Sequence, residues 1–147
     1  MDNLELQKTA NEVRKGIITA VYNAKSGHPG GSLSAADIYT YLYFEEMNID
    51  PENPKKADRD RLVVSKGHTS PGYYSALAHR GFFPVEDLKT FRHVGSYLQG
   101  HPDMKHIPGV DISSVASLMI IPPQNVQQYY LHEHLNLHFL RKFEHHL

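Results

Sequence analysis

Residues 61–71 read RLVVSKGHTSP, and their pattern is the strongest local indication of architecture in the chain. The β-branched run at 61–65 predicts a short buried strand. A glycine turn carrying His68 follows it directly, and Pro71 opens a helix that we expect to end near Gly81. A strand, a glycine turn and a helix start in this order are typical of a ligand site at the carboxyl edge of a parallel sheet.

Two further histidines stand next to glycine in predicted turns. Residues 26–34 read SGHPGGSLS and carry His28, and residues 100–103 read GHPD and carry His101. Glycine permits a positive φ and a close approach of a ligand to the backbone, so such histidines are well placed to face a cavity. Singly, each is equally well explained as a loop histidine that caps a helix. Together with His68, they predict one polar site.

Helices are predicted on both sides of the first turn. Apolar residues recur every three or four positions over 4–23, which indicates an amphipathic helix. The turn at 26–31 should stop that helix, because proline and glycine disfavour its continuation. Ser34 is then expected to cap a second helix over 35–47. The buried side of this second helix would hold Ile38, Tyr41, Leu42 and Met47.

Composition excludes several classes of function. The chain has 147 residues, a net charge of −1 and no cysteine. Balanced charge disfavours nucleic acid and anionic membranes as partners, and the absence of cysteine excludes disulfides and thiolate metal sites. We find no signal peptide and no apolar run near the roughly 20 residues that a membrane span needs. We therefore expect a cytoplasmic protein with neither nucleic acid nor membrane as a partner.

In combination, these motifs resemble the thiamine-diphosphate domain of transketolase, the amino-terminal part of that enzyme. The three matching motifs are residues 26–38, residues 58–68, and the series 88–92, 95–96, 100–103 and 108–111. The resemblance covers residues 1–114 and is greatest to the split form, in which two chains make one enzyme. It implies an α/β fold, with a parallel sheet flanked by helices and a visible part that is mostly helical. Residues 1–114 would be a truncated thiamine-diphosphate-binding domain.

The resemblance also implies a reaction and a site. Transketolases transfer a two-carbon ketol unit between sugar phosphates, using thiamine diphosphate with Mg²⁺. By position, His28 and His101 would be catalytic, contacting carbonyl and hydroxyl oxygens of the donor sugar, and His68 with Gly67 would bind the cofactor near its diphosphate. Histidine suits this work because it exchanges protons near neutral pH. Asp37 and Arg92 are interpreted as structural or solvated, whereas the role of Lys66 is left open.

The resemblance ends at Ser114. The glycine-rich segment that should follow is absent, as is the Gly-Asp-Gly motif that holds the metal, so we assign no metal ligands to this chain. Residues 115–147 are expected to be a tail outside the family, helical from 124, and a shifted or prematurely ended reading frame explains it better than a new module. We expect the chain alone to be inactive and to need a partner, either as a homo-oligomer or with a carboxyl-terminal transketolase subunit.

Three alternatives remain open. The chain could be a non-catalytic fragment that self-associates or docks on a relative, because helices without their sheet leave apolar faces uncovered. It could be a metal-binding helical protein, since His134 and His138 stand at i and i+4 in the tail. A related enzyme that makes a deoxyxylulose phosphate shares part of the first motif, but the third motif favours transketolase.

Overall fold

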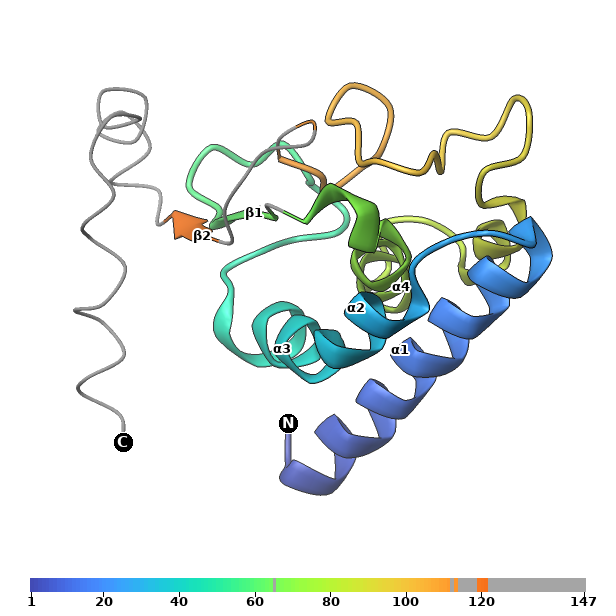
Figure 1. Cartoon of the computed structure of the whole chain (residues 1–147). Coiled ribbons are helices and arrows are strands. Elements are labelled where there is room, and N and C mark those ends of the chain that lie inside the picture. The colour runs from blue at the N-terminus through green and yellow to red at the C-terminus, as the bar shows by residue number, and fades with distance from the viewer. Residues whose placement is uncertain (65, 112, 114–118, 122–147) are drawn as a thin grey trace.

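The structure is a computed structural model that describes residues 1–64, 66–111, 113 and 119–121. The predicted tail helix from 124, with His134 and His138, lies outside the described residues. Within them, no helix is both long enough and apolar enough to cross a membrane. The elements, in chain order, are α1 (Asn3–Ala24), α2 (Pro29–Ser34), α3 (Ala36–Tyr41), the π-helical turn η1 (Leu42–Glu46), β1 (Arg61–Val63), the 3₁₀ turn η2 (Gly67–Thr69), α4 (Ser70–Arg80), the 3₁₀ turn η3 (Val85–Thr90) and β2 (Met119–Ile121) (Figure 1).

The first predicted helix is confirmed as α1. It begins with a capping box, in which the Asp2 carboxylate accepts from the Glu5 N–H at 2.8 Å and the Glu5 carboxylate accepts from the Asp2 N–H at 3.1 Å. These bonds satisfy amides that a helix start leaves without partners. The helix ends at Lys25, which adopts the left-handed conformation with φ 52°. Its buried stripe consists of Ala10, Val13, Gly16, Ile17 and Ala20.

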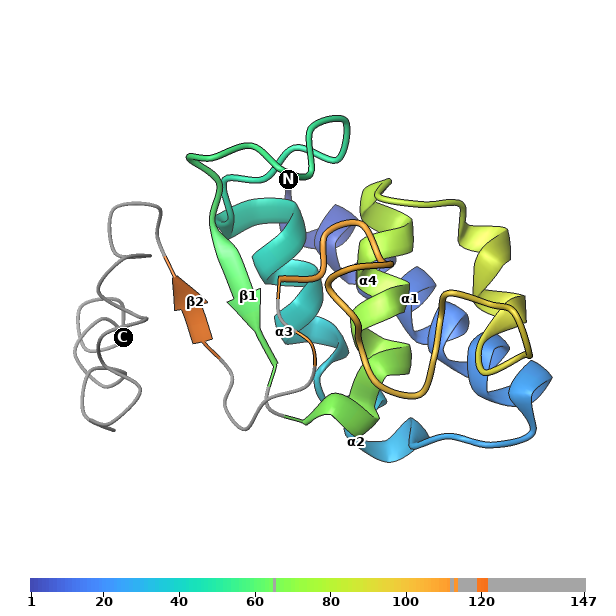
Figure 2. The same cartoon turned by 90° about the horizontal axis from the view of Figure 1, so that it is seen from above.

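Helix α4 is the centre of the core and lies between α1 and α3 (Figure 2). Every residue from Ser70 to Ala78 is buried. The crossing with α1 is close, because a Cβ added at Gly16 would stand 2.2 Å from Ser75 Oγ. The Ser75 hydroxyl donates to the Val13 carbonyl at 2.7 Å. This contact fixes α4 against α1 and thereby sets where the amino-terminal end of α4 lies.

The helix expected over 35–47 is found within one residue at each end, as α3 followed by η1 over 36–46, but an unpredicted helix precedes it and its cap differs. A short helix, α2, begins at Pro29, whose fixed φ and missing N–H suit the first helical position. The chain turns at Ala35, which takes the cap position of α3 in place of the predicted Ser34. The Ser34 hydroxyl instead donates back to the Gly31 carbonyl at 3.0 Å.

The predicted inner face of this region is half correct. Leu42 and Met47 are buried, but Ile38 and Tyr41 are each 49% exposed. The face toward α4 is instead led by Tyr39, whose ring stacks on a tyrosine of α4 at a centroid distance of 5.9 Å. Aromatic area and ring stacking favour this rotation of the helix over the burial of one isoleucine.

The predicted strand is confirmed over Arg61–Val63, shorter than the expected 61–65. It pairs with β2 in an antiparallel ladder, with Arg61 opposite Ile121. The described residues form this one two-stranded antiparallel ladder, so the expected parallel sheet is not confirmed among them.

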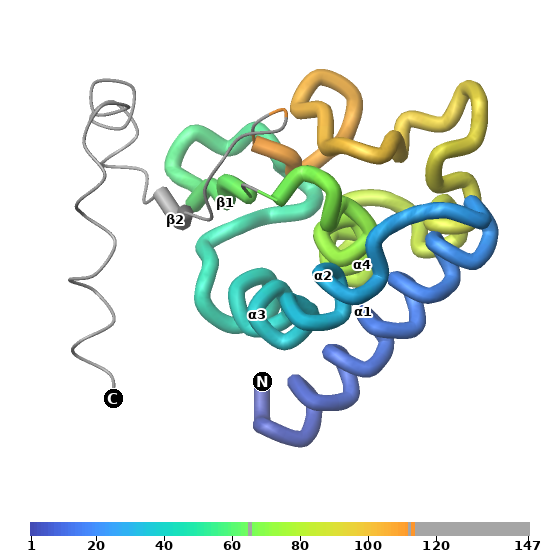
Figure 3. Tube along the Cα trace, viewed as in Figure 1, coloured from blue at the N-terminus to red at the C-terminus, as the bar shows by residue number. Residues whose placement is uncertain are grey.

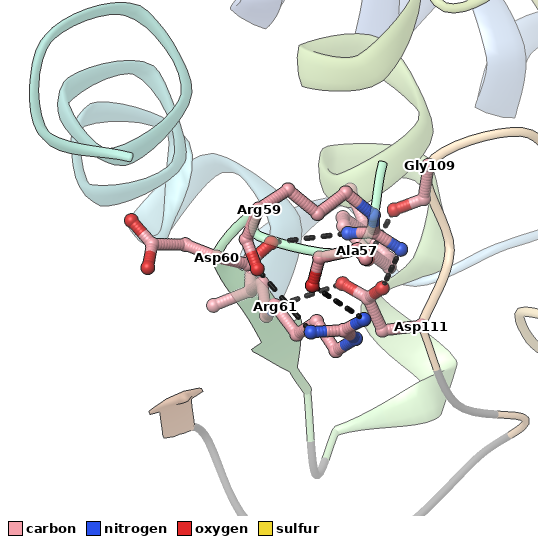
Figure 4. Close-up of polar contacts among 8 residues, drawn as sticks. Ala57, Arg59, Asp60, Arg61, Gly109 and Asp111 are labelled. Carbon is pink, nitrogen blue, oxygen red and sulfur yellow. Dashed lines mark hydrogen bonds and ion pairs between the residues drawn. The ribbon is translucent and has the colours of Figure 1, made fainter. Parts of the chain in front are cut away.

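A segment without helix or strand runs from residue 93 to 111 over the helices and returns to β1 (Figure 3). Its end is anchored by Asp111, which pairs with the buried Arg59 and accepts from the Leu62 N–H at 2.8 Å (Figure 4). Burial raises the pKa of the Asp111 carboxyl, against the lowering effect of Arg59. The Tyr73 hydroxyl donates a further bond to the Gly109 carbonyl at 3.2 Å. The segment is therefore tied to both β1 and α4.

Candidate functional site

His28 lies between α1 and α2 and is the cap residue of α2. Gly27, just before it, has φ +144°, which a residue with a side chain rarely adopts. The His28 carbonyl accepts from the hydroxyl of Ser32 at 3.0 Å. The main chain is therefore fixed while the His28 side chain stays exposed.

His68 lies in η2, the turn that joins β1 to α4. The turn is closed by Thr69, whose N–H and hydroxyl both donate to the Lys66 carbonyl, at 2.8 and 2.7 Å. Gly67 is buried, whereas His68 and Lys66 are exposed. One short loop thus presents an imidazole and an ammonium group to solvent.

The structure brings His28 and His68 together. Their ring centroids are 5.0 Å apart, with the rings inclined at 65°. The two turns are joined by Ser32, which is fully buried and whose hydroxyl lies 3.3 Å from the Thr69 carbonyl and 3.0 Å from the His28 carbonyl. Gly31 permits this approach, since a Cβ there would stand 2.8 Å from a methyl of Thr69.

His101 joins the same end of α4 through the main chain. The carbonyl of Gly100, just before it, accepts from the Ser70 hydroxyl at 2.8 Å, and Ser70 is the first residue of α4. One turn further along, the Tyr74 hydroxyl donates to the Gln99 carbonyl at 2.8 Å. The His101 side chain is exposed. The three predicted histidines therefore belong to loops that meet at the amino-terminal end of α4.

Sequence reasoning missed the two buried serines that hold these loops. Ser32 connects the His28 turn to η2, and Ser70 connects α4 to the His101 segment. Ser32 stands inside the motif of His28, and Ser70 lies two residues after His68, but their partners are 37 and 30 residues away in sequence. A local pattern contains no signal for such contacts.

A separate polar cluster lies just beyond His101. Asp103 accepts from the Lys105 N–H at 2.9 Å and from Ser113 at 3.0 Å, and it pairs with His106 at 2.7 Å. These bonds, led by that of Lys105, lower the pKa of Asp103 to about 2. Among the residues that the structure describes, no group of three His, Asp or Glu side chains is arranged to hold a metal ion.

The two residues interpreted as structural differ in their surroundings. Asp37 is exposed and pairs with Arg14 at 2.5 Å, which agrees with a surface role. Arg92, by contrast, contacts the turns of two of the histidines.

The chain belongs to the transketolase family, because the family model for the transketolase thiamine diphosphate binding domain matches residues 6–116. A 6-deoxy-6-sulfo-D-fructose transketolase subunit of Clostridium sp. (strain MSTE9) is 44% identical over 111 residues, which are 76% of this chain and 40% of that protein. An apulose-4-phosphate transketolase subunit of Phocaeicola vulgatus is 41% identical over 116 residues, 79% of this chain and 40% of that protein. The chain thus spans about two-fifths of these relatives.

Solved structures agree with the family assignment. The transketolase of Campylobacter jejuni superposes with a TM-score of 0.71 at 40% identity, over 78% of this chain and 18% of that one. A Pichia stipitis transketolase in complex with sedoheptulose 7-phosphate superposes with a TM-score of 0.70 at 38% identity, over 74% of this chain and 16% of that one. The predicted membership of the transketolase family and the mostly helical character of the visible part are confirmed.

Proposed function

We propose that this chain supplies the amino-terminal part of a thiamine-diphosphate-dependent transketolase, which moves a two-carbon ketol unit between sugar phosphates. The observation that carries the proposal is the pair of exposed imidazoles of His28 and His68, 5.0 Å apart beside the start of α4. Ser70 holds the main chain before His101 at the same place. Exposed side chains on fixed main chain are what a site for a polar ligand requires.

In this proposal, His28 and His101 exchange protons with the sugar. An imidazole can donate from one ring nitrogen and accept at the other, so it can serve both a hydroxyl and a carbonyl oxygen. Both side chains are exposed and can be reached by a substrate. Positioned acid–base groups of this kind contribute about 10²- to 10⁴-fold in rate.

His68, with the backbone of Gly67, would hold the diphosphate side of thiamine diphosphate. The fit rests on the exposed imidazole of His68 and the exposed ammonium of Lys66, which share one loop and suit an anion. When bound, thiamine diphosphate supplies the nucleophilic carbon and the electron sink. Mg²⁺ on a diphosphate usually needs only one or two carboxylates, and the Gly-Asp-Gly motif expected to supply them is absent from the sequence. The metal ligands are therefore proposed to lie elsewhere in the assembled enzyme.

The proposed enzyme also needs a partner chain. Two relatives are named as transketolase subunits, and this chain spans about two-fifths of each. We propose that a carboxyl-terminal transketolase subunit or a second copy of the chain completes the site. In the assembled enzyme, β1 would join a parallel sheet. The segment of this chain that belongs to the family would end near Ser114. The substrates would be sugar phosphates or related sugar derivatives.

Calorimetric titration with thiamine diphosphate and Mg²⁺ tests the proposal. The titration uses a chimera in which residues 1–111 replace the matching segment of the Campylobacter jejuni transketolase, because no metal ligands are assigned to this chain. We expect saturable binding near one cofactor per chimeric chain. His68→Ala should lose this binding, whereas His93→Ala should keep it, because His93 is also an exposed loop histidine but lies outside the proposed site. No heat from the chimera with unaltered residues 1–111, or equal binding by both variants, would contradict the proposed cofactor site.

A second candidate function is that of a non-catalytic fragment that associates with itself or with a relative. It is favoured by large apolar side chains that stay exposed on α1 and α3. Apolar side chains left exposed on neighbouring helices are available to a partner surface. Sedimentation velocity together with the calorimetric titration distinguishes the two candidates, since this one requires concentration-dependent size without cofactor binding. The exposed apolar residues on these helices are Leu4, Ile18, Tyr22, Ile38 and Tyr41.

A further inference from the structure

The corner formed by Phe91 and Arg92 lies against two of the glycine–histidine steps. A Cβ added at Gly27 would stand 3.5 Å from the Phe91 ring. One added at Gly100 would stand 2.8 Å from Arg92 Nε and 2.9 Å from Nη2. His28 and His101 are the residues that directly follow these two glycines. One corner of the chain thus supports the turns before both proposed catalytic histidines.

Arg92 has an unusual backbone conformation. Its φ is +61°, in the left-handed region that a residue with a side chain rarely occupies. The surroundings stabilise it there, because the Arg92 N–H donates to the Leu98 carbonyl at 2.8 Å and the guanidinium lies 5.5 Å from the centroid of the buried Phe91 ring. Left-handed backbone held in place by such contacts is concentrated at functional sites.

The guanidinium connects the two turns through different atoms. Its Nη1 donates to the Ser26 hydroxyl at 2.9 Å, two residues before His28. Its Nε and Nη2 cover Gly100, one residue before His101, and leave no room for a side chain there. A planar group with several donors can make both contacts at once, which the single ammonium of lysine cannot.

We propose that Arg92 is a positioning residue that sets the spacing of His28 and His101 by holding both turns on one guanidinium. The importance of that spacing rests on the proposed function, but the contact itself does not. Arg92 acts on the two imidazoles indirectly, through Ser26 and Gly100.

The test measures backbone order and imidazole signals by NMR in the full chain without cofactor. In Arg92→Ala, we expect order parameters at 26–28 and 100–101 to fall from about 0.85 to below about 0.6. The ring Cε1–H signals of His28 and His101 should both shift. Lys89→Ala is the matched control, because it removes an exposed cation of η3 that pairs with Glu86 instead.

Two milder variants separate the contacts and remain informative if Arg92→Ala does not fold. Ser26→Ala should loosen 26–28 only. Arg92→Lys keeps a donor for Ser26 but cannot cover Gly100, so it should loosen 100–101 only. Unchanged order at both turns in all three variants, or an equal loss of order throughout α4, would overturn the proposal. Because no cofactor is present, a failure of thiamine diphosphate to bind would leave this result standing.

Discussion

Replacement of Gly16 by alanine tests the close crossing of α1 and α4 that places the amino-terminal end of α4. The new Cβ would stand 2.2 Å from Ser75 Oγ and 3.0 Å from atoms of His79 and Leu88. The Ser75 side chain would have to rotate away and would give up its buried bond to the Val13 carbonyl.

The magnitude follows from three contributions. Loss of a buried hydrogen bond costs about 1–3 kcal/mol, and the two tight contacts add a cost of about 1 kcal/mol. Alanine gains about 1 kcal/mol over glycine inside a helix. We therefore expect a net loss of about 2 kcal/mol in the free energy of unfolding. For a chain of this length, that corresponds to a fall in Tm of about 4–8 °C.

Urea denaturation and thermal melting followed by circular dichroism measure this loss. Gly30→Ala is the matched control, since Gly30 lies in α2 with nothing within 4 Å of an added Cβ, and it should leave stability unchanged or slightly raised. In a Ser75→Ala background, Gly16→Ala should cost less, because the crowded oxygen is gone. If Gly16→Ala is as stable as Gly30→Ala, the close crossing is refuted.

Two further predictions concern carboxylates. Asp111→Asn leaves the buried Arg59 without its counter-charge and should lower the free energy of unfolding by about 3–5 kcal/mol in urea denaturation. The control Asp37→Asn breaks an exposed pair and should change it little. Equal stability of the two variants would refute the role of Asp111. The pKa of Asp103 is about 2 against an ordinary 3.8, so its stabilising effect is present above about 3.8 and is lost as pH falls through about 2. In an NMR titration, its carboxyl midpoint should lie near 2 and rise in His106→Ala; a midpoint near 3.8 in the unaltered chain would contradict these contacts.

The sequence predicted the elements whose signals are local. The 3.6-residue pattern of α1, the β-branched run at Arg61, and the helix from Ser70 to a left-handed Gly81 all appear where expected. The sequence does not predict α2, because Pro29 between glycines indicates the end of a helix as readily as the first position of a new one.

The features that sequence could not predict depend on contacts between distant segments. Tyr39 turns inward, and Ile38 outward, because of a tyrosine on α4 that lies far along the chain. Similarly, the three glycine–histidine turns indicated one site, but the means of bringing them together depend on Ser32 and Ser70. Short polar side chains of this kind look the same in a sequence whether they face water or bind a carbonyl 30 residues away.

An activity measurement on a chimera tests the proposed function without waiting for the natural partner chain. Residues 1–111 of this chain replace the matching segment of the Campylobacter jejuni transketolase, with which the chain shares 40% identity, and two-carbon transfer between sugar phosphates is followed. We predict an active enzyme that loses about 10²- to 10⁴-fold in turnover when His101 is changed to alanine and is unaffected by His93→Ala. A folded chimera without transferase activity, or with activity insensitive to His101→Ala, would contradict the proposed function.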